Sequence, residues 1–82
     1  RGIRVNAIGP GSVATDAYVA RLRAREDAGG RTVDEALDEE GRATPLQRLT
    51  TPEDVARATL FLASGLASGV TGHIVPVGSP FI

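Results

Sequence analysis

Three groups of side chains in this sequence could take part in chemistry: a tyrosine, a histidine and a run of acids. Tyr18 could act as a general acid, His73 as a proton carrier, and the acids of residues 34–40 as metal ligands. The sequence contains no lysine and no cysteine. With no lysine to lower its pKa from about 10, a tyrosine is a poor general acid at neutral pH. We therefore predict that Tyr18 packs against other residues or lines a substrate loop.

The histidine and the acids also favour structural roles. His73 is the only histidine, and the absence of cysteine leaves no set of ligands for a zinc site. We expect His73 to make an ordinary hydrogen bond at the start of a strand. No other ligand residues cluster with the acids of residues 34–40, so we interpret these acids as a solvated helix face.

The composition excludes several classes of protein. Nine arginines face ten acids, which gives a formal net charge of -1, whereas a nucleic-acid surface shows a basic excess. No apolar run approaches the roughly 20 residues of a membrane span. We therefore expect a cytoplasmic protein that binds neither nucleic acid nor a membrane. Because the sequence starts at Arg1 and contains no methionine, we also expect the remainder of the fold to lie upstream.

The first half of the chain predicts a strand, a tight loop and a helical excursion. The β-branched residues Ile3, Val5 and Ile8 predict a buried strand over residues 3–8, which the Gly9-Pro10-Gly11 turn ends. Thr15 or Asp16 is a suitable N-cap for a helix that ends at Gly29-Gly30. Thr32 and Glu35 have the spacing of a capping box and predict a second, short helix. That helix is strongly acidic and weakly apolar, so we expect it to be exposed and mobile.

The second half predicts a long helix and a last strand. Thr51 suits an N-cap, Pro52 suits the first turn, and Glu53 and Asp54 complement the helix dipole. Apolar residues between 55 and 63 form two neighbouring stripes, and Gly65 follows where a C-terminal cap would lie. Residues 73–77 predict an edge or terminal strand, because they include a proline. Two apolar strands joined by a helix predict an α/β fold, with a parallel sheet covered on both faces.

Four segments resemble the short-chain dehydrogenase/reductase family, in the family's order and over nearly the whole chain. The first follows the pattern I-R-V-N-x-x-x-P-G-x-V-x-T, which this chain satisfies with residues 3–15. The others are PLQRL at 45–49 with TPEDVA at 51–56, FLAS at 61–64, and VTGHI at 70–74. The resemblance implies the C-terminal portion of a Rossmann-like, doubly wound parallel sheet, in which residues 1–82 belong to one NAD(P)-binding domain. Residues of about 16–50 would be its variable substrate loop.

The resemblance also implies a cofactor site, because loops at the carboxyl ends of such strands line the cofactor crevice. Pro10 and Gly11 would lie beside the nicotinamide ring of NAD or NADP. The Val13 main chain would bond the carboxamide, and the Thr15 hydroxyl would bond the carboxamide or a pyrophosphate oxygen. The residues alone leave other roles open: Pro10-Gly11 could be an ordinary strand-ending turn and Thr15 simply a helix cap.

The family's catalytic residues are not in this sequence. Its Gly-rich phosphate loop, its catalytic Ser and its Tyr-x-x-x-Lys pair are missing, since Tyr18 is followed four residues later by Leu22. We predict a segment of an oxidoreductase that transfers a hydride between nicotinamide and an alcohol or carbonyl substrate. The alternative is a non-catalytic truncated fragment or assembly module that docks through its long helix and last strand. The family also implies a homo-oligomer, although the tail Val77-Gly78-Ser79-Pro80 departs from the usual Val-Asp-Gly-Gly.

Overall fold

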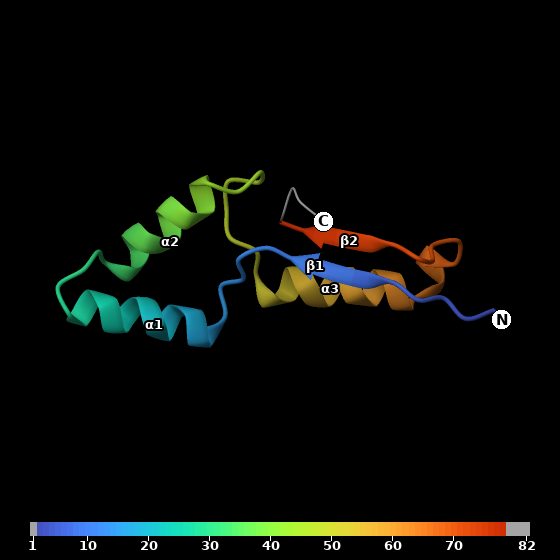
Figure 1. Ribbon diagram of the computed structural model, residues 1–82, viewed down its shortest axis with the longest axis horizontal. Helices are drawn as coiled ribbons and strands as arrows, with labels where there is room; N and C mark the ends of the chain where they lie inside the picture. The colour runs from blue at the N-terminus through green and yellow to red at the C-terminus, as the bar shows by residue number, and fades with distance from the viewer. Residues whose placement is uncertain (1, 79–82) are drawn as a thin grey trace.

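The computed structural model describes residues 2–78 and contains two strands, three α-helices and one short 3₁₀ helix. Strands β1 (Ala7–Pro10) and β2 (Ile74–Val77) are parallel and adjacent, with Ala7 opposite Ile74 and Pro10 opposite Val77. Helix α3 (Pro52–Ala63) packs against both strands, and the 3₁₀ helix Gly65–Ala67 leads from α3 toward β2. The predicted α/β fold with parallel pairing is confirmed (Figure 1).

Strand β1 is shorter than predicted and lies further along the chain. Ile3 and Val5 precede it and are exposed, and β1 itself is only partly buried rather than buried as predicted, because within residues 2–78 only β2 and α3 lie against it. Pro10 was predicted to lie in the turn that ends the strand, but it is the last residue of β1. Ala7 N donates to His73 O at 2.9 Å and Gly11 N donates to Val77 O at 3.0 Å. Since N–H groups alternate in direction along a strand, the missing N–H of Pro10 would point away from β2.

Helices α1 (Asp16–Asp27) and α2 (Val33–Arg42) form a hairpin that extends away from the sheet (Figure 1). Thr15 and Thr32 are their N-caps, with side chains that accept hydrogen bonds from Tyr18 N and Glu35 N, both at 3.1 Å. The Glu35 side chain meets the Thr32 hydroxyl at 3.0 Å rather than the Thr32 backbone N–H. Only half of the predicted capping box is therefore formed.

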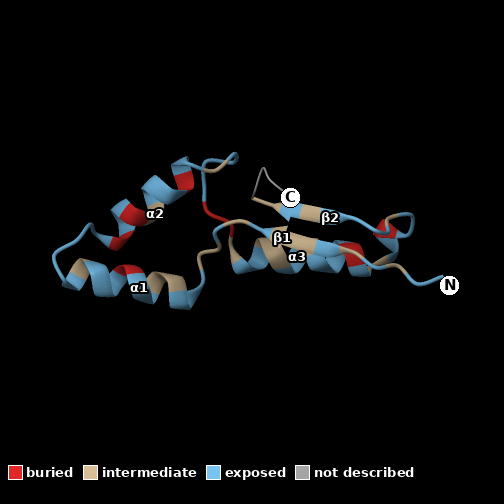
Figure 2. Ribbon diagram, viewed as in Figure 1, coloured by how far each residue is buried: buried red, intermediate tan, exposed pale blue. Residues whose placement is uncertain are grey.

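The prediction that α2 would be exposed is wrong for one face of the helix. Val33 and Ala36 of α2 are buried with Leu22 of α1 in a small apolar cluster, which Figure 2 shows as buried positions where the two helices face each other. The hydrophobic effect explains the arrangement, because each helix has only a narrow apolar stripe and hides it against the other. The acidic residues of α2 stay on its outer face.

Helix α3 begins as predicted, with a complete capping box. The Thr51 side chain accepts from Asp54 N at 3.0 Å, and the Asp54 carboxylate accepts from Thr51 N at 2.9 Å. Only one of the two predicted apolar stripes is covered: Leu62 of the first stripe is buried, whereas Leu60 of the second is 70% exposed. The described sheet has two strands, and α3 covers one side of it. The predicted cover on both faces is absent from residues 2–78.

Candidate functional site

The four residues predicted to bind a cofactor lie in one continuous loop between β1 and α1. Pro10 ends the strand, Gly11 is tied to β2 through its N–H, and Thr15 caps α1. Val13 lies midway and forms an isolated parallel bridge with Thr50. We call residues 10–15 the β1–α1 loop. It follows the carboxyl end of a parallel strand, where ligands of open α/β sheets bind.

Within residues 2–78 the β1–α1 loop offers two backbone N–H groups without a hydrogen-bond partner, those of Ser12 and Val13, and two hydroxyls, those of Ser12 and Thr15; the predicted cofactor contacts use Val13 N and the Thr15 hydroxyl. In the bridge to Thr50 the bonds are made by the neighbours of Val13, so the N–H of Val13 points to the opposite side. Among residues 2–78 this N–H has no hydrogen-bond partner. The Thr15 hydroxyl accepts from Tyr18 N at 3.1 Å, and its own proton remains available to an acceptor. A ligand with a carbonyl oxygen could therefore bond to either group.

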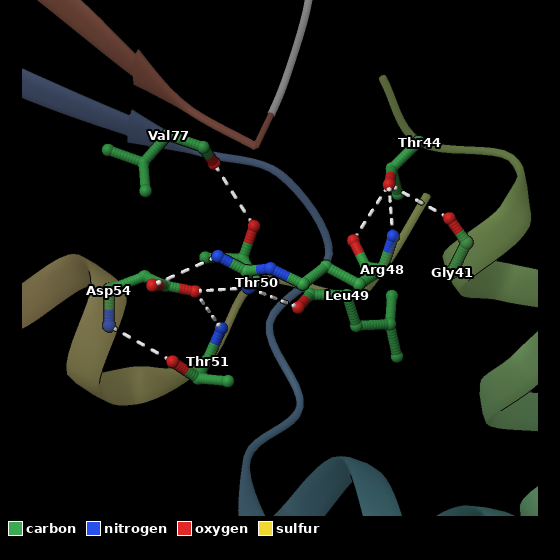
Figure 3. Close-up of polar contacts among 8 residues, drawn as sticks. All are labelled: Gly41, Thr44, Arg48, Leu49, Thr50, Thr51, Asp54 and Val77. Atoms are coloured by element: carbon green, nitrogen blue, oxygen red, sulfur yellow. Dashed lines mark hydrogen bonds and ion pairs between the residues drawn. The ribbon is translucent and has the colours of Figure 1, made fainter. Parts of the chain in front are cut away.

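A second segment, residues 49–51, runs beside the β1–α1 loop and fixes it. Thr50 N donates to Ser12 O at 3.3 Å, and Ala14 N donates to Thr50 O at 2.9 Å. Thr50 is 3% exposed, and its hydroxyl donates to Val77 O at 3.3 Å (Figure 3). Sequence reasoning missed this residue. The sequence held one signal for it. Two threonines, Thr50 and Thr51, precede Pro52, and because one threonine is enough to cap the helix, the other is available for a different role.

An ion pair joins the start of α3 to the segment that precedes it. The Arg48 guanidinium bonds both carboxylate oxygens of Asp54, at 2.7 and 3.3 Å (Figure 3). The hydrogen bond from Arg48, followed by the one from Thr51 N, holds the pKa of the Asp54 carboxyl well below its ordinary value. The same pairing raises the pKa of Arg48. Asp54 is therefore fully charged near neutral pH and accepts from both the cap and the arginine.

Tyr18, His73 and the acids of residues 34–40 lie outside the β1–α1 loop. Tyr18 packs against the cluster of Leu22, Val33 and Ala36, as predicted for a packing residue. The backbone N–H of His73 donates to the Asn6 side chain at 3.2 Å. Two of the acids form ion pairs with arginines, Asp38 with Arg42 and Glu39 with Arg31. Tyr18 and Glu40 line a small pocket together with Ser12 of the β1–α1 loop, whereas His73 lies beside Asn6, at the other end of the strands.

Known proteins resemble this chain over most of its length. The model of the family described as Enoyl-(Acyl carrier protein) reductase matches residues 1–79. The chain belongs to the short-chain dehydrogenase/reductase family. It is 45% identical over 80 residues to galactitol 2-dehydrogenase of Rhizobium johnstonii, covering 98% of this chain and 28% of that enzyme. It is 40% identical over 76 residues to versicolorin reductase 1 of Dothistroma septosporum, covering 92% of this chain and 29% of that enzyme.

Solved structures of the short-chain dehydrogenase/reductase family share the fold. A short chain dehydrogenase family protein from Francisella tularensis superposes with a TM-score of 0.79 at 34% identity, over 93% of this chain and 31% of that protein. L-sorbose reductase from Gluconobacter frateurii, solved with NADPH and L-sorbose, superposes with a TM-score of 0.81 at 28% identity, over 94% of this chain and 30% of that enzyme. The chain thus spans less than a third of the length of these relatives. None of the helices within residues 2–78 has the length and apolar character needed to cross a bilayer.

Proposed function

We propose that this chain is the part of an NAD- or NADP-dependent oxidoreductase that holds the nicotinamide end of the cofactor. The observation that carries the proposal is the N–H of Val13, which has no hydrogen-bond partner within residues 2–78 and lies in a loop at the carboxyl end of a parallel strand. The full enzyme would transfer a hydride between nicotinamide and a small alcohol or carbonyl substrate. Its catalytic Ser, Tyr and Lys would lie outside this chain.

Each residue of the β1–α1 loop has a role that its position allows. Pro10 and Gly11 would form the wall beside the nicotinamide ring, with Gly11 adding no side chain there. Val13 N would donate to the carboxamide, and the Thr15 hydroxyl would donate to the carboxamide or to a pyrophosphate oxygen. Bound nicotinamide supplies or accepts the hydride, and the loop contributes orientation, because a fixed ring keeps the reacting atoms in line. We assign residues of about 16–50, which include α1 and α2, to the substrate loop.

The experiment replaces Thr15 by valine in the complete protein that carries this chain. Binding of NADH and NADPH is followed by cofactor fluorescence, and turnover by nicotinamide absorbance. Losing the hydroxyl should weaken cofactor binding by about 0.5–1.5 kcal/mol. The matched control is Thr32→Val, which removes the equivalent N-cap of α2, away from the β1–α1 loop, and should leave cofactor affinity unchanged. Wild-type affinity in the Thr15 variant, or no nicotinamide binding by the wild type, would overturn the proposal.

A second candidate is an assembly module, favoured by the apolar outer face of α3 and the segments beside it. The side chains of Leu60, Leu66 and Ile74 are 70%, 84% and 58% exposed, and exposed apolar groups of this size mark contact surfaces. The same exposed side chains would also serve a homo-oligomer of the enzyme. An upstream reading frame that encodes the Gly-rich loop and Tyr-x-x-x-Lys supports the enzyme, whereas a stop codon there supports the module. A cytoplasmic location stays a prediction in both cases.

A further inference from the structure

The helical hairpin is joined to the rest of the described chain by two short segments alone. Helices α1 and α2 contact each other, but within residues 2–78 neither helix contacts α3, β1 or β2. The chain leaves the sheet through residues 12–14 and returns through residues 49–51, and these segments pair through the Val13–Thr50 bridge. We call the two segments together the neck. Figure 1 shows the hairpin and the sheet on opposite sides of it.

One carbonyl group connects the neck, the β1–α1 loop and the end of β2. Val77 O accepts from Gly11 N at 3.0 Å and from the Thr50 hydroxyl at 3.3 Å. The backbone of Thr50 is in turn bonded to Ser12 and Ala14, on either side of Val13. Thr50 therefore holds the loop twice, directly through its backbone and indirectly through the oxygen that also anchors Gly11.

The Thr50 side chain has little freedom to adopt another position. It is almost fully buried, and the segment before α3 is one of the buried stretches in Figure 2. Gly78 lies directly against the Thr50 hydroxyl, and a Cβ added at Gly78 would overlap Thr50 Oγ1. Gly78 has a φ of 71°, which favours glycine at this position as well. The hydroxyl is thus held between the end of β2 and the neck, in the geometry that reaches Val77 O.

We propose that Thr50 is a positioning residue for the nicotinamide site, acting by fixing the neck against the end of β2. The inference rests on the proposed function, in which the Val13 N–H donates to the nicotinamide carboxamide, because Thr50 would fix the direction of that N–H. With the hydroxyl bond in place, the loop is ordered before the cofactor arrives, and binding costs less conformational entropy. Without that bond, the neck can shift relative to Val77, and the cofactor must order it on binding.

The experiment compares Thr50→Val with Thr50→Ser in the complete protein. Valine keeps the branched shape and removes the hydroxyl, whereas serine keeps the hydroxyl. Thr50→Val should raise the dissociation constant for NADH or NADPH about twofold to tenfold, the range expected for one lost hydrogen bond. Thr50→Ser should stay close to the wild type. The matched control is Thr59→Val, which removes a threonine hydroxyl bonded to a carbonyl, Val55 O at 2.8 Å, on the exposed side of α3.

The decisive readout is the split between kinetic constants. If Thr50 is a positioning residue, Thr50→Val raises KM for the cofactor more than KM for the substrate, and Thr50→Ser has a cofactor KM close to that of the wild type. A purely structural role would lower the melting temperature of Thr50→Val while cofactor affinity in the folded enzyme stays unchanged, and that result would overturn the inference. The same cofactor loss in Thr59→Val would also overturn it. If the wild type binds no nicotinamide cofactor, the proposed function fails instead, so the two failures are distinguishable.

Discussion

Replacing Gly78 by alanine tests whether Thr50 and the end of β2 are as closely packed as the structure shows. Two costs add in this variant. A residue other than glycine in the left-handed region, here at φ 71°, costs roughly 1–2 kcal/mol. The new Cβ also overlaps Thr50 Oγ1, and overpacking of a buried site typically costs about 1–3 kcal/mol. We expect Gly78→Ala to lower the free energy of unfolding of the complete protein by about 2–5 kcal/mol in total.

A double-mutant cycle separates the two costs, with urea unfolding followed by circular dichroism. Thr50→Ala removes Oγ1 and leaves its own Cβ at 3.3 Å from the added group. In that background Gly78→Ala should keep only the backbone cost, so the coupling between the two sites should be about 1–3 kcal/mol. Equal destabilisation by Gly78→Ala in both backgrounds would show that Thr50 Oγ1 does not contact this position, and the geometry of the neck would be refuted.

Two further predictions concern acid and the isolated chain. Because the pKa of Asp54 is lower in the folded than in the unfolded state, its contribution to stability is present above the unfolded value of about 3.9 and is lost as the pH falls below it. The difference in free energy of unfolding between wild type and Asp54→Asn should therefore be constant near neutral pH and shrink in acid. Denaturant titrations at a series of pH values measure it, and a constant difference down to pH 2 would contradict the prediction. The isolated 82-residue chain should show no cooperative thermal melt by circular dichroism, because Ile3 and Val5 are 77% and 70% exposed. It should also show no turnover of NADH or NADPH, because the sequence contains no lysine to activate a tyrosine as the proton donor. A cooperative melt from a monomer, or measurable turnover, would contradict it.

The starts of all three helices could be predicted from the sequence, because an N-cap is a local interaction. Thr15, Thr32 and Thr51 each accept from a backbone N–H three residues later, as their spacing indicated. The parallel pairing of the two strands was also predictable, since an apolar strand, a helix and a second apolar strand favour a right-handed crossover in one sheet.

The features that were not predictable depend on tertiary contacts. The burial of Val33 and Ala36 required a partner helix, and helix composition alone does not reveal one. The bounds of β1 depend on the short length of β2. The role of Thr50 arises because residues 12–14, 49–51 and 77 meet in space, and no spacing in the sequence encodes that meeting. The cofactor contacts of the β1–α1 loop come from family resemblance and stay predictions.

The neck also makes the helical hairpin a modular insertion. Because Ala14 and Thr50 are bonded to each other, the ends of the intervening segment are already closed before any of its own structure forms. The entropy of closing such a loop grows slowly with length, by about 0.6 kcal/mol for each doubling. Residues 16–47 could therefore be lengthened, shortened or exchanged at small cost to the sheet. Substrate preference could then diversify while the backbone donor at Val13 stays in place, which makes this segment a natural position for grafting new specificities.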